Sequence, residues 1–285
     1  MKLSEIYLRD PFIYVEDDVC YLIGTSDKQA WGGKASGFLG YKSIDLVNFE
    51  GPYVLFENSD EFWADENFWA PELHKINGKY YIFASFFKKG LHRASQVLIC
   101  DTPFGRYKPS FKPFTPKEWE CLDATHYEEN GKHYAVFCHE WVQTHDGEVC
   151  VGELNNDFTE LKNIKLLFHA SEAKWVVNYT PTSEIPNLVT DGPFIYKTKD
   201  NVLLMIWSSF SKDGYALGVA KSENGIFGPW IQNDEPLIKN GGGHGMIFTF
   251  KGKLYLIIHI NNDEHLKERP CIIEIIEKDN ELYIK

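Results

Sequence analysis

The stretch Asp10-Pro11-Phe12-Ile13-Tyr14, followed after a polar turn by Tyr21-Leu22-Ile23-Gly24, is the unit that decides the fold of this 285-residue chain. A similar pair of apolar runs separated by a turn occurs about five times, at intervals of about 53 to 68 residues. A strand–turn–strand unit repeated at such a spacing is typical of a β-propeller. The other copies begin with Ala70-Pro71-Glu72-Leu73-His74, Asp123-Ala124-Thr125-His126-Tyr127, Asp191-Gly192-Pro193-Phe194-Ile195-Tyr196 and His244-Gly245-Met246-Ile247-Phe248.

A second phrase, a polar turn closed by an aromatic or large apolar residue, lies between successive copies of the first, at 43–50, 101–106, 154–161 and 222–230. Such turns are typical of an outer hairpin that packs down onto a sheet. No apolar pattern of helical period persists for more than about two turns, and no linker divides the chain. We therefore expect an all-β chain that forms a single five-bladed β-propeller over residues 1–285, with four-stranded antiparallel blades around a central channel.

Composition limits the classes of ligand. Hydrophobic residues make up 44% of the chain and aromatic residues 15%, which is enough for a large core. The net charge of -12 argues against binding to nucleic acid or to an anionic membrane surface, because both need clustered Lys and Arg. No apolar run is long enough to span a membrane. The six cysteines form no CxxC pair, and the first repeat begins close to Met1, so we expect reduced thiols and a cytoplasmic protein.

Acidic residues begin three of the five copies. Because the inner strands of a propeller run in the same sense along the channel, the starts of the copies should meet at one mouth, which brings Asp10, Asp123 and Asp191 face to face. An aspartate before Pro or Gly is more often a turn residue than a catalytic one, but three in apparent register favour chemistry. Two carboxylates about 6.5–9.5 Å apart would suit a glycosidase that inverts configuration, and the third would change a pKa. His244 occupies the same register.

Aromatic side chains supply candidate contacts to a sugar ring. Trp69 directly precedes a repeat start and should lie near the mouth, where its face could stack on a saccharide. Trp207 is a second substrate-binding candidate, although the tryptophans of this chain could equally belong to the core. A small saccharide is therefore the expected partner, and the oligomeric state stays open.

The motifs resemble those of glycoside hydrolase family 43, with one motif in each expected blade: Arg9-Asp10-Pro11-Phe12, Trp69-Ala70-Pro71-Glu72, Leu122-Asp123, Thr190-Asp191-Gly192-Pro193-Phe194 and Gly243-His244-Gly245. The resemblance implies an inverting glycosidase of the α-L-arabinofuranosidase or β-xylosidase type. It implies that Asp10 is the general base, that Asp123 raises the pKa of the acid and orients it, and that Asp191 is the general acid. It also implies that Arg269 contacts substrate, with a surface arginine as the alternative reading of this residue. No organic cofactor is expected, although a calcium ion or a water molecule could lie on the axis near His244.

One departure from the family pattern concerns the acid. The family usually has Glu-Gly-Pro where this chain has Asp191-Gly192-Pro193, so the acidic side chain is one methylene, or about 1.5 Å, shorter. Glu140 is the alternative acid, and a salt bridge at the edge of the core is its alternative role. A non-catalytic carbohydrate-binding propeller is the second functional class. A third, a retaining enzyme acting on fructosides, would need a Glu-Cys acid motif that this chain lacks. The sequence does not decide between arabinose and xylose as the sugar, or between exo and endo action. The early first repeat leads us to expect short imported oligosaccharides as substrates, which favours exo action.

Overall fold

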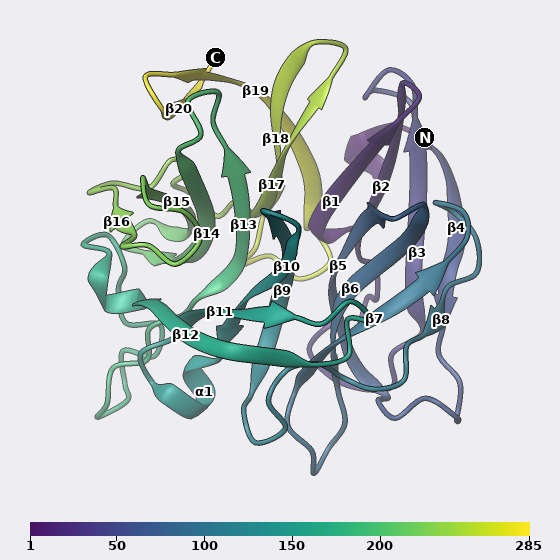
Figure 1. Ribbon diagram of the computed structural model, residues 1–285, viewed down its shortest axis with the longest axis horizontal. Helices are drawn as coiled ribbons and strands as arrows, with labels where there is room; N and C mark the ends of the chain where they lie inside the picture. Colours follow the sequence, from purple (N-terminus) through teal and green to yellow (C-terminus); the bar gives the residue numbers. More distant parts are fainter.

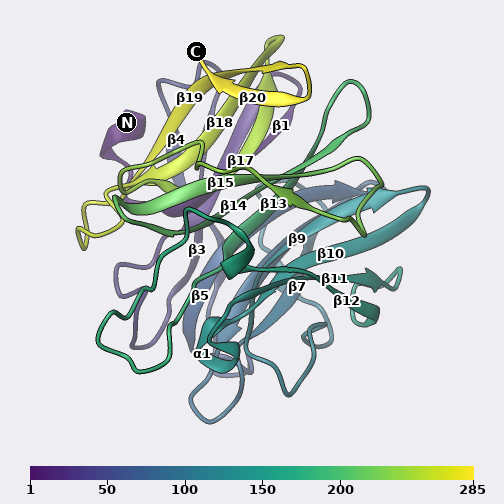
Figure 2. The same ribbon diagram turned by 90° about the vertical axis from the view of Figure 1, so that its left-hand side faces the viewer.

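The computed structural model describes residues 1–285 and shows five four-stranded antiparallel sheets around a central axis (Figure 1). Each sheet is built from four strands that are consecutive in sequence. The first strand of every sheet packs against the first strands of both neighbouring sheets, and β1 closes the ring by packing against β17. The fifth blade lies at the top of Figure 2 and the third at its lower right. The five-bladed propeller expected from the repeat is confirmed.

The strands fall into four classes by their place in a blade. The inner strands are β1 (Arg9–Glu16), β5 (Glu66–Ile76), β9 (Cys121–Glu129), β13 (Asp191–Lys197) and β17 (Gly243–Phe250). The second strands are β2 (Val19–Thr25), β6 (Lys79–Phe87), β10 (Lys132–His139), β14 (Leu203–Ser211) and β18 (Lys253–Ile260). The third strands are β3 (Gly37–Ser43), β7 (Ala94–Cys100), β11 (Glu148–Leu154), β15 (Gly214–Ser222) and β19 (Arg269–Lys278). The outer strands are β4 (Glu50–Glu57), β8 (Lys108–Pro109), β12 (Leu161–His169), β16 (Ile231–Gln232) and β20 (Glu281–Ile284).

Helix is confined to three short segments, namely α1 (Trp141–Thr144) and the 3-10 turns η1 (Leu3–Glu5) and η2 (Ala170–Glu172). None of the helices has the length and apolar character needed to cross a membrane.

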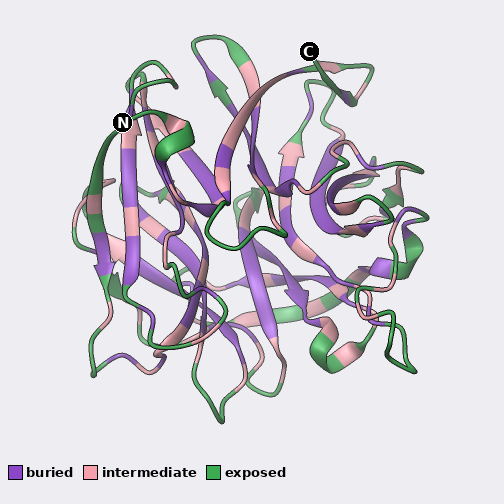
Figure 3. Ribbon diagram, turned by 180° about the vertical axis from the view of Figure 1, so that it is seen from behind, coloured by how far each residue is buried: buried purple, intermediate pink, exposed green.

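The core lies between adjacent blades. Buried apolar side chains form four clusters, each contributed by neighbouring blades, and burial is concentrated in the strands (Figure 3). Between the first two blades, Phe38 packs on Phe68 and Phe86, and the rings of Phe68 and Phe86 meet edge to face with centroids 4.9 Å apart. Such a pair adds about 0.5–1.5 kcal/mol to what its buried area contributes. This packing holds the first two blades against each other.

A β-bulge opens every inner strand at the same place. The residue before the bulge pairs with the end of the second strand, and we call these five residues the mouth ring: Arg9, Trp69, Leu122, Asp191 and Gly243. The next residue has a left-handed backbone with φ between 44° and 56°, and these five form the bulge ring: Asp10, Ala70, Asp123, Gly192 and His244. A bulge of this kind re-aims the side chain next to it.

The two rings correct the expected register of the acidic residues. Asp10 and Asp123 belong to the bulge ring, whereas Asp191 belongs to the mouth ring and is equivalent to Arg9. The expectation that all three aspartates hold the same repeat position is therefore wrong by one residue. The prolines mark the true register, because Pro11 follows Asp10 while Pro193 follows Gly192.

Hydrogen bonds join the bulge ring to the preceding blade. At four of the five junctions the backbone N–H of the bulge residue donates to a side chain at the end of the previous second strand: Ala70 to Thr25 Oγ1 (2.8 Å), Asp123 to Ser85 Oγ (2.8 Å), His244 to Ser208 Oγ (2.8 Å) and Asp10 to His259 Nδ1 (3.2 Å). At the remaining junction the equivalent position is Cys138, and a thiol is a weak acceptor. There the N–H of Gly192 donates to Asp123 Oδ2 instead, at 3.0 Å.

Candidate active site

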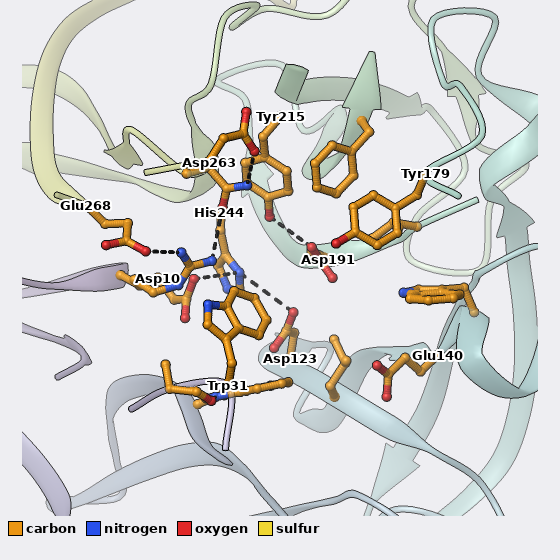
Figure 4. Close-up of a pocket in the computed structure, with 18 of the residues that line it drawn as sticks. Asp10, Trp31, Asp123, Glu140, Tyr179, Asp191, Tyr215, His244, Asp263 and Glu268 are labelled. Carbon is orange, nitrogen blue, oxygen red and sulfur yellow. Dashed lines mark hydrogen bonds and ion pairs between the residues drawn. The ribbon is translucent and has the colours of Figure 1, made fainter. Parts of the chain in front are cut away.

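A cavity of about 400 Å³ opens at the mouth ring and receives residues from every blade (Figure 4). Carboxylates and aromatic rings dominate its wall. The acidic members are Asp10, Asp123, Glu140, Asp191, Asp263 and Glu268, and the aromatic members include Trp31, Trp69, Trp141, Tyr179, Phe210 and Tyr215. The structure thus brings together the three aspartates, Glu140, Trp69 and His244, as the sequence predicted, and leaves Trp207 and Arg269 outside.

Asp10 is held in its ionised form. Its Oδ2 accepts a hydrogen bond from the hydroxyl of Thr25 at 2.6 Å, and its Oδ1 lies 3.3 Å from His244 Nδ1. Burial alone would raise the pKa of Asp10, but His244 and the guanidinium of Arg9 outweigh it and lower the pKa below the ordinary aspartate value. An ionised carboxylate with this support can accept a proton from water.

Asp191 has the opposite character. It lies across the cavity from Asp10, and its Oδ2 accepts a hydrogen bond of 3.0 Å from the hydroxyl of Tyr215 (Figure 4). Burial, followed by the charge of Asp123, raises the pKa of Asp191 to about 7. A carboxyl group with such a pKa retains its proton in much of the neutral range and can act as a general acid.

Asp123 lies between these two groups. Besides the N–H of Gly192, its Oδ2 faces His244 Nδ1 at 3.7 Å. Burial, followed by the charge of Asp10, raises the pKa of Asp123 well above the ordinary value. The charge of Asp123 in turn contributes to the raised pKa of Asp191.

Trp69 forms one wall of the cavity. The guanidinium of Arg93 lies 4.0 Å from the centroid of its ring, and its indole Nε1 donates to the carbonyl of Ala30 at 2.7 Å. Trp31, 64% exposed, meets Trp69 edge to face with centroids 5.5 Å apart. The indole of Trp69 is therefore fixed in place before any ligand arrives, which suits stacking on a sugar ring.

The opposite wall was not predicted from the sequence. Tyr179, in the 173–190 segment, packs on Phe210 with centroids 4.5 Å apart and on Trp141 at 5.6 Å. Tyr179 lies in a loop, Trp141 begins the short helix α1 and Phe210 lies near the end of β14, and no repeat pattern encodes these places around the ring, so the sequence carried no signal for them.

Glu140 forms the salt bridge that was its alternative role. Its Oε2 accepts a hydrogen bond from Arg93 Nε at 3.2 Å, and the side chain is buried. Burial raises the pKa of Glu140 although Arg93 opposes the shift. Glu140 also lines the cavity, but protonating it would leave the buried guanidinium of Arg93 without its counter-ion, so the structure favours an ionised Glu140.

Two predicted substrate contacts are wrong. Trp207 is fully buried in the core of the third and fourth blades, where it packs on Phe168 and Trp175 and donates from Nε1 to Gln232. Arg269 donates only to backbone carbonyls, those of Ser4, Leu266 and Glu268, away from the cavity.

The arginine of the cavity is Arg9. It donates to Glu268 Oε1 at 2.8 Å and to Asn262 Oδ1 at 3.0 Å, and its guanidinium lies 4.7 Å from the centroid of Trp31. Arg9 directly precedes Asp10 in the sequence, and its position in the mouth ring could have been inferred from the positions of the prolines.

The Nδ1 atom of His244, the predicted metal residue, faces two carboxylates, those of Asp10 at 3.3 Å and Asp123 at 3.7 Å. No group of three or more His, Cys, Asp or Glu side chains has an arrangement that could hold a metal ion. The residues around His244 therefore do not form a metal site by themselves.

Comparison with known proteins identifies the family. The model of glycosyl hydrolases family 43 matches residues 4–280. This chain belongs to glycosyl hydrolase family 43. It is a glycoside hydrolase, and the family expected from the motifs is confirmed.

Several known proteins are similar to this chain. An endo-arabinase from Bacteroides thetaiotaomicron is 37% identical, with a TM-score of 0.91 and coverage of 99% of this chain and 98% of that one. The extracellular exo-α-(1→5)-L-arabinofuranosidase ArbA from Cellvibrio japonicus is 21% identical over 90% of this chain and 79% of its own length. Alpha-L-arabinofuranosidase 43 from Humicola insolens is 24% identical over 59% of this chain, and the match spans only 36% of that protein.

Proposed function

We propose that this protein hydrolyses arabinose- or xylose-containing oligosaccharides with inversion of configuration, with Asp10 as general base and Asp191 as general acid. The observation that carries the proposal is the separation of two carboxyl pKa values in one cavity. That of Asp10 is lowered by His244 and Arg9, while that of Asp191 is raised to about 7 by burial and Asp123. Titratable groups whose environments push their pKa values apart indicate an acid and base pair.

The reaction is a single displacement at the anomeric carbon. Asp10 removes a proton from a water molecule while the oxygen of that water bonds to the anomeric carbon. The bond from this carbon to the glycosidic oxygen breaks, and Asp191 gives its proton to that oxygen. Asp10 ends protonated and Asp191 ionised, so one proton must return through solvent before the next turnover. Trp69 would stack on the sugar. His244 would face the carboxylates of Asp10 and Asp123 and reduce the repulsion between them.

Arabinose-containing substrates have the stronger support, because the relative with 37% identity is called an endo-arabinase. The proposal requires no organic cofactor. A calcium ion or a water molecule near His244 stays a prediction, and retention of full activity after dialysis against EDTA would argue against a required metal.

The first experiment is hydrolysis of linear arabino-oligosaccharides, 4-nitrophenyl α-L-arabinofuranoside and 4-nitrophenyl β-xyloside by the purified chain. Proton NMR of the first-formed sugar gives the anomer, and the lengths of the products distinguish exo from endo action. Release of the retained anomer would refute inversion. Binding of oligosaccharides without turnover at high protein concentration would favour the alternative, a carbohydrate-binding propeller that has lost the usual glutamate.

Variants then assign the roles. Asp10→Asn and Asp191→Asn should each lower kcat by about 10²–10⁴-fold, the usual contribution of general acid–base catalysis. Asp263→Asn is the matched control, because it removes a carboxylate from the same cavity outside the catalytic group. If Glu140→Gln abolished hydrolysis of oligosaccharides while Asp191→Asn did not, the assignment of the acid would be wrong.

A further inference from the structure

Tyr215 enters the cavity from an unusual place. It lies in β15, the third strand of the fourth blade, and is 3% exposed, yet its hydroxyl reaches Asp191 in the inner strand of the same blade (Figure 4). The hydrogen bond from this hydroxyl to Asp191 Oδ2 is 3.0 Å long, and no other side chain donates to Asp191.

Gly243 makes room for this tyrosine. Gly243 is the mouth-ring residue of the fifth blade, and it is the only member of that ring without a side chain. A Cβ atom at Gly243 would lie 2.7 Å from a ring carbon of Tyr215 and 2.8 Å from Ser208 Oγ, closer than real contacts allow. The ring of Tyr215 therefore takes the space that a mouth-ring side chain of the fifth blade would otherwise fill.

The ring of Tyr215 is fixed on two sides. It stacks on the imidazole of His259 with centroids 5.5 Å apart and planes 15° apart, and it meets Phe210 edge to face at 5.2 Å. His259 is itself fully buried and accepts the backbone N–H of Asp10. One aromatic stack thus supports both the base and the acid.

The hydroxyl of Tyr215 stays a donor across the working pH range. Burial, followed by the charges of Asp191, Asp10 and Asp123, raises its pKa well above the ordinary tyrosine value, while Arg9 opposes the shift. Because the hydroxyl of Tyr215 donates to Oδ2 of Asp191, Oδ2 acts as the acceptor. When Asp191 is neutral, its proton is therefore on Oδ1.

We propose that Tyr215 is a positioning residue for the acid, so that the short side chain of Asp191 and the hydroxyl of Tyr215 together place the carboxyl group that the longer side chain of the expected Glu-Gly-Pro motif would place alone. The inference rests on the proposed role of Asp191. The hydroxyl restrains a carboxyl group that is one methylene shorter than the usual one and selects the oxygen that carries the transferable proton. Precise placement of a catalytic group matters because a misplacement of about 1 Å can cost about 10²-fold in rate.

The test compares Tyr215→Phe with wild type on substrates that differ in their need for an acid. Arabino-oligosaccharides have a poor leaving group and need protonation, whereas a 4-nitrophenyl glycoside needs much less. We expect kcat for oligosaccharides to fall by about 10–100-fold, part of the total contribution of a general acid, with a smaller loss on the nitrophenyl substrate. Tyr80→Phe is the matched control, because it removes a tyrosine hydroxyl that donates to the carboxylate of Glu16 at 2.6 Å, and neither residue lines the cavity.

A second pair of variants tests the shared geometry. In Asp191→Glu the longer side chain would bring its carboxyl group closer to the hydroxyl of Tyr215. In the double variant with Tyr215→Phe that hydroxyl is absent, so the longer side chain has room. We expect the double variant to hydrolyse oligosaccharides faster than Tyr215→Phe alone. Equal losses of Tyr215→Phe on both substrate classes, or a double variant no better than Tyr215→Phe, would overturn the positioning role. Inactive wild-type protein would instead overturn the proposed function.

Discussion

Gly192→Ala is the change that most directly tests how the bulge ring positions the site. A Cβ atom at Gly192 would lie 2.6, 2.8 and 2.9 Å from three atoms of the His244 imidazole, whereas ordinary contacts begin at 3.4 Å. The imidazole would have to move by roughly 1 Å, which would break its 3.3 Å approach to Asp10. Since a displacement of about 1 Å can cost about 10²-fold, we expect kcat/KM to fall by about two orders of magnitude.

The backbone cost of this change can be separated from its effect on His244. The φ of Gly192 is 49°, but Ala70 occupies the same ring position at 45°, so an alanine pays only the ordinary strain of about 1–2 kcal/mol. Gly241→Ala is the matched control, because Gly241 also has a positive φ and a Cβ there would have nothing within 4 Å. Thermal unfolding and steady-state kinetics of both variants decide the point. If the two variants had kcat/KM values within threefold of each other, the reasoning about His244 would be refuted.

The protonation of Asp191 and the positions of Trp207, Arg269 and Arg9 lead to three further expected outcomes. The kcat/KM for oligosaccharides should fall as pH rises through about 7, because Asp191 loses its proton there, and a pH–rate profile measures this. Trp207→Phe should leave KM unchanged but lower the free energy of unfolding by about 1–3 kcal/mol, through a lost hydrogen bond and lost core volume, as denaturant titration would reveal. Arg269→Met should keep near wild-type kcat/KM, whereas Arg9→Met should lose activity and about 3–5 kcal/mol of stability, because it leaves Glu268 charged and buried. A large loss of activity in Arg269→Met would contradict its assignment outside the cavity.

The fold was predictable because the repeat unit is local in sequence. Each copy supplies its own inner hairpin, and the turn residues and the alternation of apolar residues mark its ends, so the number of blades follows from counting. The register of the fourth copy was missed because its first residue is acidic like that of the first copy. The prolines carried the better signal, since Pro11 and Pro193 mark the same place in the bulge.

The predictions that Trp207 and Arg269 contact substrate were wrong for physical reasons. Trp207 lies in β14, where the residues from Leu203 to Ser209 are all buried, so alternation cannot tell a core face from a cavity face. Arg269 follows Glu268, which points inward to Arg9, and successive residues of an extended chain point to opposite sides. Tyr215 and Tyr179 could not be predicted, because Tyr215 reaches the cavity from a third strand through the space left at Gly243, and Tyr179 lies in a long loop.

The hydrogen bond from the N–H of Asp10 to His259 joins the first blade to the last. His244, which helps to keep Asp10 ionised, also comes from the last blade, so the proposed base, near the start of the chain, depends on residues made nearly at its end. During refolding, four completed blades would have native strands and much native fluorescence but no competent base. Recovery of activity should therefore lag behind recovery of β-structure, and the delay between the two measures the time that the ring takes to close.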